Sequence, residues 1–318
     1  KAGAMTAMPE TKSPVAVAIE RHYEAAHEPR DSARIGASQI GNPCERAIWL
    51  AFRWASPHEK LDGRKLRLFE TGHREEARMV ADLLAIGCAV TDTDPATDEQ
   101  WEATLLGDVV VSKLDGKIES GLPGAEKTPH ILECKTMNDK SFQDWRRRGV
   151  AAYSPVYYAQ LQIGMMAHGL DRALFMATNK NTDEVETERV KYDPLAANAL
   201  VAKAERIAFT DTPPERNESF ACRWCRHAGV CKEDAWPRTN CRTCLFAELT
   251  RDGEWRCSPT GAALDLDAQK RGCKAHLFLP DLVPGEQIDA DESENTVTYK
   301  LATGAEYVDG RDAKPEAI

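Results

Sequence analysis

The fold is decided by two short stretches, Leu114-Asp115-Gly116 and Leu132-Glu133-Cys134-Lys135-Thr136. The valines at 109–111 precede the first stretch, and this β-branched run predicts a hairpin within residues 104–119. The second stretch predicts a short strand beside that hairpin. Because residues two apart on a strand face the same side, Glu133 and Lys135 should project together, and Asp115 should meet them across the sheet.

This grouping suits phosphodiester hydrolysis, which needs a divalent cation to polarise the phosphate and activate water. Carboxylates are ligands that Mg²⁺ and Mn²⁺ prefer, so we expect Asp115 and Glu133 to bind the metal, with the backbone carbonyl of Cys134 as an extra ligand. Lys135 would orient or deprotonate the attacking water. An E-x-K pair alone also fits an ordinary ion pair at an exposed strand end.

Helical patterns flank these strands on both sides. Residues 65–86 predict a long helix that carries Glu76 and ends at Gly87. Residues 141–170 predict helix broken at Pro155, and this segment carries Gln160, which could equally satisfy a buried neighbour. A strand at 172–178, a helix at 194–209 and earlier helices at 15–26 and 38–54 complete an α/β fold, with a mixed central sheet flanked by helices.

The order G-x3-E, D-G, E-x-K and Y-x2-Q resembles RecB-type nucleases of the PD-(D/E)XK superfamily. Within it, residues 35–232 look most like CRISPR-adaptation nucleases and their phage-encoded relatives. The resemblance implies a restriction-endonuclease-like core, metal binding by Asp115 and Glu133, assistance to the nucleophile by Lys135, and contact of Gln160 with the substrate strand or the active-site backbone. It also implies that Glu76 fills the acidic position of the long helix, with His73 as the alternative. The family's tyrosine four residues after the glutamine is absent, since Gly164 stands there.

Seven of the ten cysteines fall between residues 222 and 273, a density that indicates metal binding rather than disulfides. Cys222, Cys225 and Cys231 supply three thiolates. By the same resemblance, the distant Cys44 completes the ligand set of a [4Fe–4S] cluster, for which four thiolates are usual. The alternative is zinc, with His227 in place of Cys44.

A second set of cysteines has the spacing of structural zinc. Its members are Cys241, Cys244, Cys257 and Cys273, with His276 as a substitute for one of them. So few aliphatic residues surround them that this segment should need a metal to fold. The two remaining cysteines, Cys88 and Cys134, are expected in the core.

Composition is that of a water-soluble globular protein, with 42% hydrophobic and 29% charged residues among 318. No apolar run is long enough for a membrane span, so we expect a cytoplasmic protein, in a host cell if it is phage-encoded. The net charge is −10, but residues 281–318 alone hold ten acidic and three basic residues. The basic stretch 140–148 is a candidate for guiding DNA phosphates, with Lys140, Arg146, Arg147 and Arg148; its alternative is a solvated helix face.

Together these patterns predict four parts: an N-terminal extension (1–30), a nuclease core closed by the cluster (31–232), a zinc-binding module (233–280) and an acidic tail (281–318) with a hairpin over 296–301 and 306–308. The expected activity is Mg²⁺- or Mn²⁺-dependent exonuclease cleavage of single-stranded DNA or DNA ends. By resemblance, it would serve phage recombination or replication. The rivals are a non-catalytic module that binds DNA or protein through the zinc segment, and an endonuclease on the same core. Oligomeric state is not encoded in these motifs.

Overall fold

The computed structural model describes residues 12–315, so the first eleven residues of the predicted extension and the last three of the tail lie outside it. The helices are α1 (Pro14–Ala26), α2 (Ala37–Ile40), α3 (Glu45–Phe52), α4 (Gly63–Ala85), α5 (Asp139–Arg148), α6 (Val150–Tyr153), α7 (Pro155–His168), α8 (Pro194–Ala208), α9 (Ala228–Lys232) and α10 (Leu266–Arg271), with 3-10 turns η1 (Phe220–Trp224), η2 (Cys241–Thr243) and η3 (Pro280–Leu282). None of the described helices has the length and apolar character that crossing a membrane requires.

The strands are β1 (Ile35–Gly36), β2 (Ala89–Thr91), β3 (Thr93–Asp94), β4 (Glu99–Gln100), β5 (Glu102–Leu105), β6 (Val110–Lys113), β7 (Gly116–Ser120), β8 (His130–Met137), β9 (Arg172–Asn179), β10 (Val185–Lys191), β11 (Ala247–Leu249), β12 (Trp255–Cys257), β13 (Ala263–Leu264), β14 (Gly285–Asp291), β15 (Thr296–Leu301) and β16 (Glu306–Asp309). Five of them form the main sheet, in the order β10-β9-β8-β7-β2. Strands β8 and β9 run parallel and the other neighbours antiparallel, so the predicted mixed sheet is confirmed.

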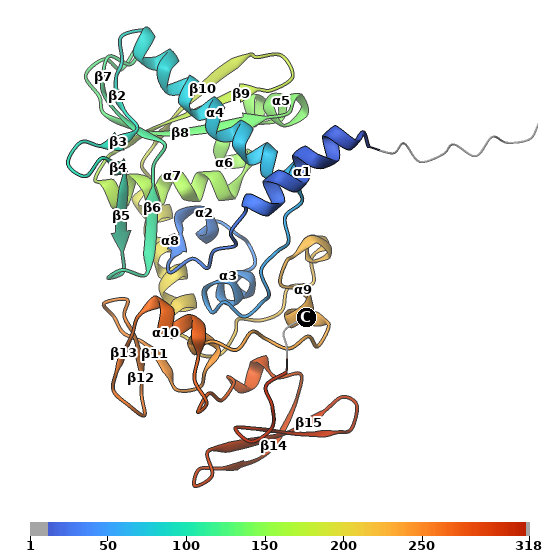
Figure 1. Cartoon of the computed structure of the whole chain (residues 1–318). Helices are drawn as coiled ribbons and strands as arrows, with labels where there is room; N and C mark the ends of the chain where they lie inside the picture. Colours follow the sequence, from blue (N-terminus) through green and yellow to red (C-terminus); the bar gives the residue numbers. More distant parts are fainter. Residues whose placement is uncertain (1–11, 316–318) are drawn as a thin grey trace, which may run out of the picture.

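Helix α4 covers one face of this sheet, and α5 and α7 cover the other (Figure 1). The alternation along β8 decides which side chain meets which helix, because successive strand residues point to opposite faces. Leu132 and Cys134 pack into the core beneath α4, whereas Ile131 packs into the core beneath α5 and α7. The odd-numbered positions of β8, which include Glu133 and Lys135, therefore face α7.

The helix boundaries follow local capping chemistry. Asp62 caps α4 by accepting a hydrogen bond from the Lys65 N–H at 2.7 Å, and Gly87 ends it with a positive φ of 93° that favours glycine. Ser154 caps α7, and Pro155 occupies its first turn, where a missing N–H costs nothing. The predicted ends of these helices are thereby confirmed to within a few residues.

The predicted hairpin over 104–119 is wrong, because β6 and β7 enter different sheets. Positive φ angles at Leu106 and Gly107 turn the chain back on itself, so β6 pairs with β5 and also with β1. Strand β7 pairs instead with β2 and β8. Residues 114 and 115 form the corner between the two sheets.

The single helix predicted over 38–54 is divided into α2 and α3. Pro43 lacks the N–H needed to continue a helix, and the Asn42 side chain accepts a hydrogen bond from the Cys44 N–H at 2.9 Å. Gly41 lets α2 approach α7 closely, since a Cβ there would lie 2.5 Å from the Val156 Cα. The break places Cys44 at the start of α3.

The C-terminal part shares a hydrophobic core with the N-terminal helices. Trp255 of β12 and Leu279 pack with Ile48 and Phe52 of α3 and with Ile207 of α8. Beyond this core, the predicted hairpin of the acidic tail is confirmed as β15 and β16, and β14 adds a third strand.

Arg242 fastens this C-terminal part to the core from inside. It is 1% exposed, its guanidinium lies 3.9 Å from the Trp54 ring, and it donates to the carbonyls of Phe52 and Ala33 at 2.9 Å each. Removing a buried charged donor leaves those carbonyls without partners in a region closed to water.

We expect Arg242→Ala to lower the free energy of unfolding by about 3 kcal/mol, measured by chemical denaturation. The control is Arg256→Ala on β12, whose side chain is 54% exposed and pairs with Glu254; it should change stability by less than about 0.5 kcal/mol. Equal effects of the two substitutions would show that Arg242 does not fasten the C-terminal part.

Candidate active site

Glu133 and Lys135 lie side by side on β8, as their spacing predicted. The Lys135 ammonium donates to Glu133 Oε1, and Gln160 Nε2 from α7 donates to Glu133 Oε2 at 2.8 Å. Glu133 is only 2% exposed, so these contacts replace water around its carboxylate. Gln162, two residues after Gln160, bonds instead to backbone atoms of 191 and 193 and is fully buried.

Asp115 reaches the same place from the corner before β7. The register pairs Gly116 with Leu132, which sets Asp115 near Glu133. Its Oδ2 accepts a hydrogen bond from the backbone N–H of Cys134 at 2.7 Å. The Cys134 contribution seen here is therefore its N–H, and metal ligation by its carbonyl remains a prediction.

Helix α4 brings Glu76 toward this group from the other side of the sheet. Burial raises the pKa of Glu76 above its ordinary value, and the Asp115 carboxylate raises it further, while His73 and Lys135 oppose this. Asp92, just after β2, also raises it and had not been foreseen. His73 thus lies near the site beside Glu76.

Tyr157 is the tyrosine of the Y-x2-Q motif, for which the sequence predicted no separate role. The Lys135 ammonium lies 5.4 Å from the centre of its ring, close enough for a cation–π interaction. Tyr157 precedes Gln160 by three residues, and this spacing places both on one face of α7. A residue larger than glycine at 164 would require Ile131 to shift, since a Cβ there would lie 2.9 Å from Ile131 Cδ1.

The electrostatics of the group are those of a site short of positive charge. Burial raises the pKa of both Asp115 and Glu133, and Asp115 and Glu76 raise that of Glu133 further. Burial alone would lower the pKa of Lys135, but the carboxylates of Glu133 and Asp115 raise it on balance. Three carboxylates face one lysine, and a cation would relieve their repulsion.

No group of three or more His, Cys, Asp or Glu side chains within residues 12–315 is arranged to hold a metal ion as it stands. At the group formed by Asp115, Glu133 and Lys135, hydrogen bonds from Lys135 and Gln160 occupy both oxygens of Glu133. The donor chemistry still fits Mg²⁺ or Mn²⁺, which take carboxylate oxygens.

The three arginines of the basic stretch after β8 form ion pairs with nearby carboxylates. Arg146 pairs with Glu184 at 2.7 Å and with Glu186 at 3.3 Å, and Asp144 pairs with both Arg147 and Arg148. Lys140, on the same helix, is exposed. Guidance of DNA by this stretch stays a prediction, and it would require the three arginines to leave these partners.

The four cysteines predicted to hold the iron–sulfur cluster come together, although 178 positions separate Cys44 from Cys222. Cys44, Cys222, Cys225 and Cys231 line one cavity with the apolar side chains of 47, 50 and 228. Burial raises the pKa of the Cys225 thiol, and the other three thiols raise it further. His227 lines the same cavity and hydrogen-bonds to Ser56 through Nδ1 at 2.8 Å.

The four cysteines of the predicted zinc set, Cys241, Cys244, Cys257 and Cys273, are also neighbours. Burial raises the pKa of Cys241 to about 11, with further contributions from Cys244, Cys273 and Cys257. His276 takes a different direction: its Nε2 lies 3.3 Å from Thr243 Oγ1 and its ring packs edge-on against Phe278. Zinc binding by Cys241, Cys244, Cys257 and Cys273 stays a prediction, because no such group within the described residues is arranged to hold a metal ion as it stands.

No protein-family model and no curated protein matches this sequence. Among solved structures, the crystal structure of SSO0001 is similar with a TM-score of 0.40 and 13% identity, over 70% of this chain and 98% of that one. An alkaline exonuclease from Laribacter hongkongensis, LHK-Exo, gives a TM-score of 0.37 and 14% identity, over 59% and 90%. Its complex with dAMP gives 0.38 and 13%. Likenesses of this strength decide neither the fold nor the function.

Repulsion among the carboxylates predicts how the site affects stability. Since the pKa of Glu76 is raised by folding, its ionised form opposes folding, and a neutral amide should relieve this. We expect Glu76→Gln to raise the thermal midpoint at pH 7 without added divalent cation. The gain should disappear as the pH falls and Glu76 takes up a proton. Differential scanning calorimetry measures both.

Glu70→Gln is the matched control, because Glu70 lies on the same helix in a surface ion pair with Arg74 and should change the midpoint little. Added Mn²⁺ should raise the midpoint of the unsubstituted protein more than that of Glu76→Gln. A lower midpoint for Glu76→Gln, with Glu70→Gln unchanged, would contradict the repulsion.

Proposed function

We propose that this chain is a divalent-metal-dependent deoxyribonuclease that acts as an exonuclease on single-stranded DNA or DNA ends. One observation carries the proposal: Asp115, Glu133 and Lys135 converge, with Glu76 beside them, at the meeting point of β7, β8 and α4. The E-x-K resemblance supports the reaction class. The resemblance to phage-encoded nucleases favours a role in phage recombination or replication.

Asp115 and Glu133 would hold the metal, with Glu76 as a third carboxylate. A bound Mg²⁺ or Mn²⁺ supplies Lewis-acid polarisation of the phosphate and a more acidic water. Gln160 fixes the orientation of the Glu133 carboxylate through its 2.8 Å hydrogen bond. The Cys134 N–H does the same for Asp115.

Lys135 acts as a proton donor and positive charge rather than as a base. Its pKa is raised by Glu133 and Asp115, so its ammonium stays protonated at neutral pH. A protonated lysine can orient the attacking water and stabilise the negative charge that develops on the phosphate. The ring of Tyr157 limits the directions in which the ammonium can turn.

Glu133→Ala and Lys135→Ala should each lower the rate of Mn²⁺-dependent cleavage of a labelled single strand by about a hundredfold or more. Cys134→Ala is the matched control from between them. Its side chain faces the core under α4, and its backbone N–H to Asp115 is retained, so activity should fall only a few-fold. Full activity of either alanine variant at 133 or 135 would overturn the assignment.

The same assay separates the rival functions. An end-dependent exonuclease leaves circular single-stranded DNA intact while it degrades the linear form. Cleavage of the circle would instead assign an endonuclease, and binding without any metal-dependent cleavage would assign a non-catalytic module.

We further propose that Cys44, Cys222, Cys225 and Cys231 hold a [4Fe–4S] cluster. Four thiols around one cavity support it, because thiolates are the ligands such clusters use. The cluster would link the start of α3 to the segment after α8. Zn²⁺ with His227 remains the alternative, and Zn²⁺ on Cys241, Cys244, Cys257 and Cys273 is proposed for the second set.

Anaerobically purified protein should be brown and contain iron, and Cys44→Ala should lose the visible absorbance and the iron. Cys88→Ala is the control, because Cys88 is buried in the core beneath α4 and should leave the colour unchanged. A colourless protein that contains zinc and no iron would assign zinc to both cysteine sets.

A further inference from the structure

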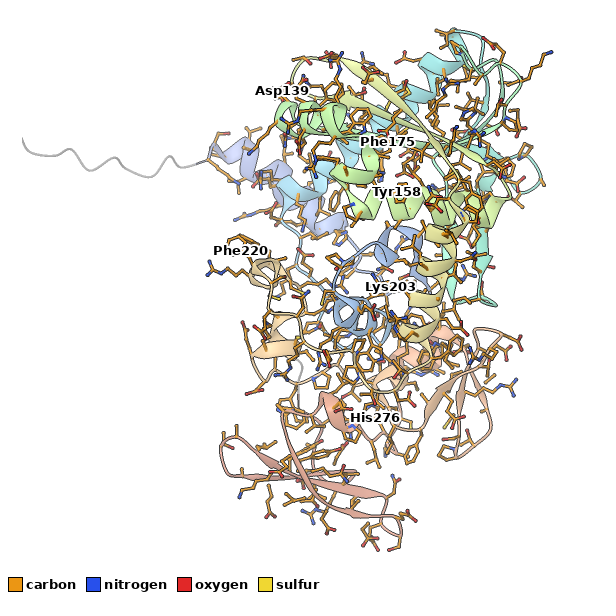
Figure 2. All side chains as sticks on the ribbon, turned by 180° about the vertical axis from the view of Figure 1, so that it is seen from behind. Asp139, Tyr158, Phe175, Lys203, Phe220 and His276 are labelled. Carbon is orange, nitrogen blue, oxygen red and sulfur yellow. The ribbon has the colours of Figure 1, made fainter. Side chains whose placement is uncertain are left out.

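Two large aromatic side chains, Phe220 and Trp224, stand exposed on the segment that carries Cys222 and Cys225. Phe220 is 65% exposed and Trp224 is 72% exposed, and their rings meet edge to face with centroids 4.7 Å apart. Figure 2 shows Phe220 at the outer edge of the molecule. Burial of these rings would be favourable, so their exposure indicates a binding surface rather than a packing role.

Residues 219–232 contain three cations, Arg223, Arg226 and Lys232. Lys232 pairs with the neighbouring Glu218 at 3.0 Å. The Arg223 guanidinium lies 4.8 Å from the Phe220 ring centre. Within residues 12–315, no carboxylate pairs with Arg223 or Arg226, whereas each arginine of 146–148 has one. Both free arginines are exposed, while the four cysteines behind them are partly buried.

Trp224 and Arg226 open onto a cavity of about 380 Å³ that leads toward the catalytic helix. Its walls come from α2, α3 and Val156 in the first turn of α7, and Arg226 is the one Asp, Glu, Lys or Arg among its described lining residues. Val156 is followed directly by Tyr157, whose ring lies against Lys135. One wall of the cavity therefore belongs to the helix that also carries Gln160.

We propose that Phe220, Trp224, Arg223 and Arg226 form a binding site for the single strand that feeds the active site. Bases stack on the two aromatic rings, and the two arginines contact backbone phosphates. Exposed aromatic residues beside cations are what sequence-independent binding of single-stranded nucleic acid requires, because every base has a face that stacks. The inference rests on the proposed function only in taking DNA as the ligand.

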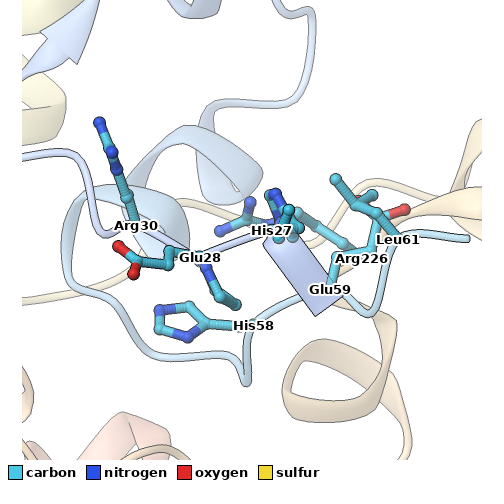
Figure 3. Close-up of a pocket in the computed structure, with 9 residues that line it drawn as sticks. His27, Glu28, Arg30, His58, Glu59, Leu61 and Arg226 are labelled. Carbon is cyan, nitrogen blue, oxygen red and sulfur yellow. The ribbon is translucent and has the colours of Figure 1, made fainter. Parts of the chain in front are cut away.

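A neighbouring cavity of about 540 Å³ shares Arg226 but suits a nucleic acid less well (Figure 3). Its lining combines Arg30 and Arg226 with Glu28 and Glu59, so its formal charges cancel. It also has no Phe, Tyr or Trp among its described lining residues. Both the charge and the aromatic rings therefore favour the cavity beside Trp224 as the site for a nucleic acid.

The test compares aromatic with aliphatic replacements at the same two positions. Phe220→Leu/Trp224→Leu keeps apolar bulk but removes the ring faces, and Phe220→Tyr/Trp224→Phe keeps them. Binding of a fluorescein-labelled twenty-nucleotide oligothymidylate is measured by anisotropy without added divalent cation, so that no strand is cut. We expect the leucine pair to bind about tenfold more weakly or worse, and the aromatic pair to bind within about twofold of the unsubstituted protein.

Binding of a blunt duplex of the same length is measured alongside. The iron content and the thermal midpoint of each protein variant are measured as controls for folding. Duplex bases are already stacked, so the leucine pair should leave duplex affinity unchanged. Equal losses for single strand and duplex, equal losses for the leucine and aromatic pairs, or unchanged single-strand binding by the leucine pair would each overturn the proposal. The last result would leave the surface to a protein partner.

The contribution of the two arginines is measured separately, from the dependence of binding on salt concentration. Arg223→Gln/Arg226→Gln should reduce the slope of log affinity against log salt concentration by about 1.4, because each phosphate contact to a single strand contributes about 0.7. Loss of affinity without change of slope would exclude phosphate contacts. Because binding is measured without cleavage, a protein that binds in this way but cuts nothing would refute the nuclease and retain this site.

Discussion

The contact between Lys135 and Glu133 constrains the whole site, because it places an ion pair where Glu133 is 2% exposed. A buried ion pair must recover the free energy lost when both charges leave water, and it does so only with further hydrogen bonds. Gln160 supplies one to Glu133, and Tyr157 offers its ring face to Lys135. The pair therefore requires α7 to lie in one orientation over β8.

The surrounding fold meets that requirement through close packing. Gly164 lets α7 approach Ile131, and Gly41 lets α2 approach the first turn of α7 at Val156. A Cβ at Gly41 would lie 2.5 Å from the Val156 Cα, so a larger residue there would have to move the backbone, whereas at Gly164 it would first meet the flexible end of Ile131. Cores on both faces of the sheet then hold β8 between α4 and α7, so that Glu76 and Gln160 approach the group from different sides of the sheet.

Much of this was predictable from local patterns, because period-two alternation fixes the facing of 133 and 135, and capping residues fix the helix ends. The hairpin prediction failed because the pairing of β6 was decided by the turn at 106–107 and by distant β1. Strand β14 was missed because every residue in it is exposed and shows no alternation. The partners of Arg146 lie in and beside β10, which no local pattern had predicted.

The net charge of the whole chain does not describe the charge at either of the two proposed sites. Three carboxylates gather around Lys135, which suits a cation, while Arg223 and Arg226 have no carboxylate partner among the described residues, which suits a phosphate backbone. The acidic C-terminal strands account for most of the net charge of −10 and belong to a separate three-stranded sheet. Helix α7 contributes to both proposed sites, because Val156 lines the cavity beside Trp224 and Gln160 donates a hydrogen bond to Glu133.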